Sequence, residues 1–204
     1  EKEVKILLQD QEQKKIYYLI IQIYKKYKLF LNKKLYKSLL ISENQNLFID
    51  KCNKAYEKIS NIIKSKETTW NYGLYNIFAV TAGDEYFYKL FLDLKKIVKE
   101  YNNNEENLWM QSWINYHKSH EVLNWHNHSW LFHGYISIDP KNTRTLFEDG
   151  TEIKNEVGNI YIGPCNLKHK VVVDKPYEGN RITLGFDVIN KNFKNNNTIS
   201  FIPL

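Results

Sequence analysis

The sequence predicts an α+β fold, with a helical first half and a β-rich second half. All four prolines and six of the eight glycines lie beyond residue 130, whereas residues 1–104 contain only Gly73 and Gly83. Because proline and glycine mark the turns between short strands, their scarcity favours long helices in the first half. The 204 residues are 43% hydrophobic, which is enough for a substantial core. We therefore expect a mainly helical region at residues 1–104, packed on an antiparallel sandwich or jelly roll at residues 105–204.

Apolar residues recur at helical spacing in three stretches of the first half. The first stretch covers residues 16–30 and the second covers residues 48–62. The third, residues 87–101, is the most regular, with Asp84 as the expected N-cap and residues 102–104 (NNN) as the end. We expect this third helix to lie against the outside of a β-sheet.

The predicted strands begin with residues 68–80 (TTWNYGLYNIFAV), which are rich in aromatic and β-branched residues and are expected to be extended. From Leu108 onward, short strands alternate with turns. Strands are predicted at residues 108–116, in one or two parts of residues 124–138, and at residues 160–164, 181–189 and 198–202. Turns are predicted at 139–142 and 148–150, and a loop at 174–180. Roughly seven strands with no helix between them indicate the sandwich or jelly roll.

Charge and cysteine content exclude several classes of protein. The net charge of +6 is concentrated in residues 1–104, which hold 19 lysines against 12 acidic residues. No alternation of basic and aromatic residues matches a nucleic-acid stacking groove, so these lysines are expected to be a solvated face. No apolar run is long enough to cross a membrane. With only Cys52 and Cys165, no disulfide framework is expected, and the chain is predicted to be cytoplasmic.

The stretch NWHNHSWLFHGYISI, residues 124–138, contains three of the six histidines: His126, His128 and His133. On a strand, residues two apart point to the same side, so His126 and His128 form a chelating pair. Imidazole is a common ligand of zinc, iron, nickel and copper, and the expected third ligand is His169. Because H-x-H occurs often by chance, an ordinary pair of hydrated or hydrogen-bonded histidines remains the alternative.

The order of these residues resembles that of the iron- and 2-oxoglutarate-dependent oxygenases, particularly the small ones carried by some phages and bacteria. The motifs WHNH, GYISI, GNIYIGPCNLKH and RITLGFDV carry the resemblance, within residues 108–189. Members of that family fold as a double-stranded β-helix, a jelly roll, and hold Fe(II) with an H-x-D/E…H triad that leaves room for 2-oxoglutarate and O2. The resemblance implies a hydroxylase with Fe(II) and 2-oxoglutarate as cofactors. Its catalytic metal ligands would be His126, His128 and His169.

Arg181 is the expected anchor of the cosubstrate. In RITLGFDV the apolar residues at even positions share one face, so Arg181 and Thr183 must point the other way, into the mouth of the barrel. A guanidinium can hold a carboxylate with two parallel hydrogen bonds. The resemblance implies that Arg181 binds the far carboxylate of 2-oxoglutarate, and Thr183 and Tyr135 are expected beside it.

One position departs from the family pattern, because His128 stands where the family has Asp or Glu. Either the metal has three histidine ligands, or His128 does not ligate and one position stays open. The alternative class is a cupin-type three-histidine metalloprotein, either a dioxygenase or a binding module. Gly158, Pro164 and His169 fit the spacing of the second cupin motif. Arg181 has no role in that pattern, which favours the oxygenase. The sequence does not name the primary substrate, although a protein side chain or small molecule is favoured over nucleic acid.

Overall fold

A computed structural model of the chain describes Lys15 and residues 33–103, 106–121, 123–190 and 200–204. The chain divides into two units, Glu1–Asn32 and Lys33–Leu204. In the first unit only Lys15, which is helical, is described, so the helix predicted at residues 16–30 lies outside the described residues. The second unit combines helices with antiparallel sheets, as the α+β prediction requires. The division at residues 104 and 105 stays a prediction.

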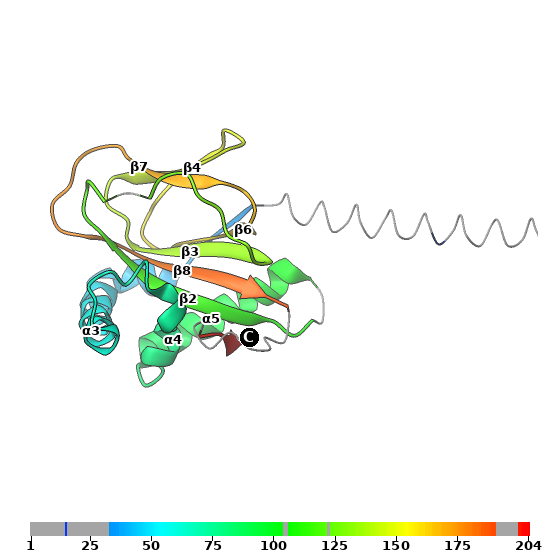
Figure 1. Cartoon of the computed structure of the whole chain (residues 1–204), viewed down its shortest axis with the longest axis horizontal. Coiled ribbons are helices and arrows are strands. Elements are labelled where there is room, and N and C mark those ends of the chain that lie inside the picture. Colours follow the sequence, from blue (N-terminus) through cyan, green and yellow to red (C-terminus); the bar gives the residue numbers. More distant parts are fainter. Residues whose placement is uncertain (1–14, 16–32, 104–105, 122, 191–199) are drawn as a thin grey trace, which may run out of the picture. The chain divides into compact units, whose positions relative to one another are not determined.

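Two antiparallel sheets form the β part of the second unit. The larger has the strand order β1-β6-β3-β8-β2-β9, and the smaller has the order β5-β4-β7. Figure 1 shows the labelled strands of the two sheets in separate layers, with β4 and β7 over one face of β3 and β8. The strands are β1 (Lys34–Lys37), β2 (Trp109–His117), β3 (Phe132–Asp139), β4 (Thr143–Phe147), β5 (Glu152–Lys154), β6 (Asn159–Pro164), β7 (His169–Val173), β8 (Arg181–Ile189) and β9 (Ile202–Pro203).

From β2 to β8 the strands pair as in one long antiparallel hairpin that is bent so that its successive strand pairs lie in different sheets. Its tip is the β4·β5 hairpin, where Gly150 has a positive φ of 81°. The next pairs outward are β3·β6, then a bridge between His126 and β7, and finally β2·β8. These pairs belong alternately to the small and the large sheet. Segments distant in sequence are thereby brought together between the two sheets.

Helices cover the other face of the large sheet (Figure 1). The longest are α3 (Gln45–Ile63) and α5 (Glu85–Asn102), as predicted, and Asp84 caps α5 by accepting hydrogen bonds from the backbone N–H groups of Tyr86 and Phe87. Asn103 ends α5 in the left-handed conformation at φ 49°. Apolar side chains at the even positions of β8 are fully buried, and Tyr101 of α5 meets Phe132 of β3 edge to face. The main core therefore lies between these helices and the large sheet.

One expectation about the first half is wrong, and one element was not expected. Residues 68–80 are not extended, because they contain turns, the 3-10 helix η1 (Tyr72–Leu74) and α4 (Ile77–Val80). The Asn76 side chain caps α4, and the Tyr75 hydroxyl is bonded to the backbone of Thr68 and Ile114, so these aromatic residues are packed by tertiary contacts. The region also contains an unpredicted strand, β1, which lies at the sheet edge and is followed by the short helix α2 (Leu39–Glu43).

Among the described residues, no helix is long and apolar enough to span a membrane.

Candidate metal centre

The segment that carries His126 and His128 is not a regular strand, contrary to the prediction. Only His126 forms a bridge, exchanging backbone hydrogen bonds of 3.0 and 2.9 Å with His169. The His128 N–H instead donates to Cys165 O at 2.8 Å. The turn between Pro164 and Leu167 interrupts the pairing, so the two histidines do not follow the simple alternation of a strand. Even so, the segment runs alongside the start of β7 and brings both side chains to His169.

His126, His128 and His169 form a cluster that could hold a metal ion. One nitrogen from each ring lies within 4.8 Å of the other two. Each Nδ1 faces an oxygen that can only accept a hydrogen bond: Asn124 O for His126 at 2.7 Å, Leu167 O for His169 at 3.3 Å, and the Asp187 carboxylate for His128 at 3.0 Å. The proton of each neutral ring therefore belongs on Nδ1, which leaves the Nε2 lone pair available to a metal.

Burial favours the neutral form of His126 and His169, as metal binding requires. It lowers the pKa of His126, and burial together with the neighbouring histidines lowers the pKa of His169 to about 2. The Nε2 atom of His128 is buried without a hydrogen-bond partner among the described residues. An unpaired buried acceptor is costly, and a metal ion would satisfy it.

Asp187 and His133 complete the cluster, and neither was predicted to take part. Asp187 is fully buried and accepts hydrogen bonds from Nδ1 of His128 at 3.0 Å and of His133 at 2.8 Å. Burial alone would raise the pKa of Asp187, but the hydrogen bonds and the electrostatic attraction from His128 and His133 outweigh it, so the pKa is lowered. Burial lowers the pKa of His133 to about 4. Strand alternation could have identified Asp187, because it has the same parity as Arg181 in β8.

The predicted anchor Arg181 is buried on the same face of β8. Its side chain forms no ion pair within the described part of the chain, and its Nε has no hydrogen-bond partner there. Burial lowers the pKa of Arg181, and nearby Tyr135 and Tyr177 act in the opposite direction. The other arginine, Arg144, pairs with both Glu152 and Asp174. Arg181 is thus a buried cation without a carboxylate.

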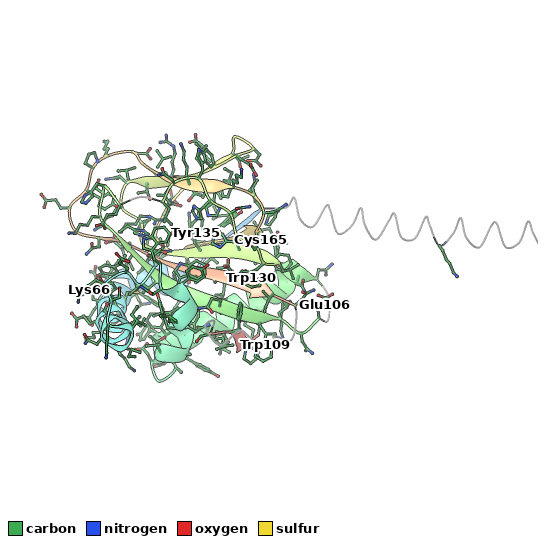
Figure 2. The ribbon with its side chains drawn as sticks, in the orientation of Figure 1. Lys66, Glu106, Trp109, Trp130, Tyr135 and Cys165 are labelled. Carbon is green, nitrogen blue, oxygen red and sulfur yellow. The ribbon has the colours of Figure 1, made fainter. Side chains whose placement is uncertain are left out.

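Thr183 and Tyr135 lie on the inner face with Arg181, as predicted, and both already have protein partners. The Thr183 hydroxyl accepts from Asn115 Nδ2 at 3.1 Å and can still donate its own proton. The Tyr135 hydroxyl donates to Asn155 Oδ1 at 3.0 Å. Figure 2 shows Tyr135 between the two sheets, where it packs with Tyr161 and Phe147.

Two further polar residues near Arg181 were not predicted. Ser137 pairs with Thr183 across β3 and β8, and its buried hydroxyl has no partner among the described residues. His117 pairs with Arg181 across β2 and β8 and has an unpartnered Nδ1. Burial, helped by the charge of Arg181, lowers the pKa of His117 to about 4. His117 is the last residue of β2 and is not part of the following turn.

A cavity of about 460 Å³ opens beside His126 and His128. Its wall includes four of the chain's five tryptophans: Trp70, Trp113, Trp125 and Trp130. Among the described residues that line it, Asp187 is the only acidic one and none is lysine or arginine. Both carboxylate oxygens of Asp187 are already hydrogen-bonded. The cavity therefore offers aromatic faces and neutral polar groups next to the histidine cluster. A larger cavity of about 580 Å³, bordered by Thr69 and His117, touches none of the clustered histidines.

No protein-family model matches the chain, and no curated protein matches it either. One solved structure that resembles it, from Caulobacter crescentus, is provisionally described as a 2OG-Fe(II) oxygenase family protein. That likeness has a TM-score of 0.35 and 14% sequence identity, and it covers 54% of this chain and 48% of the other. The chain thus spans about half the length of that protein.

Proposed function

We propose that this protein is an Fe(II)- and 2-oxoglutarate-dependent oxygenase, a hydroxylase with His126, His128 and His169 as its metal ligands. The donor set fits a first-row metal, because each of the three imidazoles offers one nitrogen within 4.8 Å of the other two. Iron bound here would allow O2 to oxidise both 2-oxoglutarate, which is lost as succinate and CO2, and an unactivated C–H bond of the substrate. The protein's own residues hold the metal, orient the cosubstrate and keep water away.

The observation that carries the proposal is the buried Arg181, which has no carboxylate among the described residues. Burying an unpaired charge is strongly unfavourable, so a ligand that supplies the anion is expected. Arg181 shares the inner face of β8 with Asp187, which contacts the metal cluster. A dicarboxylate that reaches the metal with one end and Arg181 with the other fits this arrangement. Thr183 and Ser137 offer further hydroxyl donors beside the guanidinium.

The strand pairing supports the jelly-roll part of the proposal. In a jelly roll, a long antiparallel hairpin is wrapped so that successive pairs fall in opposite sheets. The sequence of pairs β4·β5, β3·β6, His126·β7 and β2·β8 follows that plan. In this jelly roll the metal ligands lie at the start of β7 and on the segment paired with it, and Arg181 lies on β8, a central strand of the large sheet.

The tryptophan-lined cavity is our proposed entry for the primary substrate. It reaches His126 and His128, so a molecule in it would lie beside the metal. Since the lining offers no free cation or anion, the cavity favours an uncharged group, one that packs on indole rings. Those rings would also exclude water from the reacting atoms.

Titration with 2-oxoglutarate tests this function. We expect the metal-loaded wild type, kept under anaerobic conditions, to bind 2-oxoglutarate in a calorimeter. Arg181→Ala should bind it about 30- to several-thousand-fold more weakly, because losing one partner of a buried charge pair costs roughly 2–5 kcal/mol. Arg181→Lys keeps the charge but not the planar fork, so its affinity should fall between those of Arg181→Ala and the wild type. Metal affinity should stay nearly unchanged, since Arg181 touches none of the three histidines.

Arg144→Lys is the matched control, because Arg144 is the only other arginine and already has carboxylate partners. It should leave 2-oxoglutarate binding unaltered. If the wild type fails to bind 2-oxoglutarate, or Arg181→Ala binds it as well as wild type, the oxygenase proposal is wrong. The three-histidine cupin-type metalloprotein would then take its place.

A further inference from the structure

Asp187 is a buried carboxylate whose side-chain hydrogen bonds in the described part of the chain are with two imidazoles. It has no exposed surface, and it forms no ion pair with any described lysine or arginine. Its two oxygens accept from two different rings, Oδ2 from His128 and Oδ1 from His133. A buried carboxylate lowers the stability of the fold unless hydrogen-bond partners compensate its charge. Here the imidazoles of His128 and His133 are those partners.

The three proposed metal ligands differ in what holds their Nδ1–H groups. His126 and His169 donate to backbone carbonyls of Asn124 and Leu167, which are neutral acceptors. Only His128 donates to a carboxylate. A carboxylate acceptor fixes the tautomer and ring orientation of a ligating histidine and makes it a stronger donor to the metal. In the oxygenase family that the sequence resembles, the position of His128 is occupied by a carboxylate.

His128, His133 and Asp187 form a second group of possible ligand atoms, all within 4.8 Å of one another. The two imidazole rings are stacked face to face, with centroids 3.7 Å apart and planes inclined by 11°. We assign His133 to the carboxylate and not to the metal, because its Nδ1 atom already faces Asp187. His133 donates to the second oxygen of Asp187 and fixes the orientation of the carboxylate.

We propose that Asp187 is the carboxylate of this metal centre and acts through His128 as a positioning residue. The inference rests on the metal site of the proposed function. Three neutral imidazoles leave the full charge of a divalent ion uncompensated, unlike the usual two-histidine, one-carboxylate site. Asp187 places a negative charge one imidazole away from the ion and aims the buried Nε2 of His128 at it.

Metal affinity is the first test. Asp187→Asn keeps the size of the side chain but removes its charge, and it should weaken Co(II) or Zn(II) binding by about 10- to 100-fold. It should also shift the visible ligand-field bands of the Co(II)-loaded protein. The matched control is Asp139→Asn, a carboxylate of the neighbouring strand β3 that pairs with Lys141 and should leave both readouts unchanged. His133→Phe keeps a stacked ring, and its metal loss should be smaller than that of Asp187→Asn.

Nitrogen NMR of the metal-free protein is the second test, and its wild-type measurement requires no variant to fold. The His128 ring should be a single tautomer with its proton on Nδ1, and Asp187→Asn should lose that preference. A wild type that binds no metal would defeat the proposed function, while the tautomer would still test the role of Asp187. The inference is overturned if His128 carries its proton on Nε2. It is also overturned if Asp187→Asn retains wild-type metal affinity, or if His133→Phe abolishes binding, which would make His133 a ligand.

Discussion

The position of one proton on each ring decides what the histidine cluster can bind. In His126, His128 and His169 the Nδ1 atom is hydrogen-bonded to an oxygen, so the same nitrogen, Nε2, is left free in each ring. A site in which the rings used different nitrogens would need different ring orientations. The local hydrogen bonds thus prepare the ligand atoms before any metal arrives.

Replacing His126 by Ala should abolish tight metal binding, because two imidazoles alone form a much weaker site. The measurement is a metal titration of the purified variant, followed by competition with a chelator. His120→Ala is the control, since the His120 side chain is exposed in a loop and does not belong to the cluster. Unchanged metal affinity in His126→Ala would contradict the assignment of this histidine as a ligand.

At individual positions, the sequence predicted the cluster better than it predicted the groups around it. The alternation of side chains in β8 placed Arg181 and Thr183 on the inner face, and the structure has them there. The same alternation places Asp187 on that face, but its role depends on His128 and His133, which reach it from other segments. Such a contact depends on long-range packing and has no local signature.

At Gly134, strand β3 lies very close to both neighbouring strands, β6 and β8. A Cβ built on Gly134 would lie 2.1 Å from Cζ of Phe186 in β8 and 2.3 Å from the backbone oxygen of Tyr161 in β6. A backbone oxygen in a sheet cannot move aside without disturbing the hydrogen-bond ladder. This glycine therefore allows β6, β3 and β8 to assemble into one sheet.

Gly134→Ala should lower the free energy of unfolding by roughly 1–3 kcal/mol, the usual cost of overpacking a core. Urea denaturation followed by circular dichroism would measure it. Gly83→Ala is the matched control, because a Cβ there meets nothing within 4 Å and should leave stability unchanged or slightly raised. Equal stability of the two variants would show that β3 can move away from its neighbours.

Long periodic elements were predictable, whereas the short strand β1 and the irregular segments were not. The periodicity of α3 and α5 and the alternation of β8 follow from their own residues. In contrast, residues 68–80 have the composition of a strand but fold into turns and short helices, because their aromatic side chains are held by β2. The segment around His126 likewise takes its path from β7.

Across the molecule, buried neutral histidines make the fold sensitive to acid. Burial lowers the pKa of His117 and of His133 to about 4, well below the value of about 6.5 in an unfolded chain. Between these two values the unfolded chain binds more protons than the folded one, so stability falls as the pH falls. Each such histidine contributes up to about 1.4 kcal/mol per pH unit within that window.

The free energy of unfolding of the metal-free protein should therefore fall steadily from about pH 6.5 toward pH 4. Above about pH 7 it should change little with pH. Urea unfolding at a series of pH values, in the presence of a chelator, would show this as a falling midpoint. His117→Gln removes one of the buried titrating groups and should show a shallower slope. A midpoint that does not change between pH 7 and pH 5 would rule out this source of acid sensitivity.

The folded-back hairpin also has a kinetic consequence. Its successive pairs join residues 8, 26, 43 and 72 positions apart, as in Thr145 with Ile153, Tyr135 with Tyr161, His126 with His169, and Trp113 with Gly185. Contacts that close longer loops form more slowly, so the order of assembly runs outward from the β4·β5 tip. Arg181 and Asp187 lie on the strand that closes the longest loop. During refolding, the histidines can therefore meet before the carboxylate and the guanidinium reach them, and competence to bind ligands should appear only in the last phase.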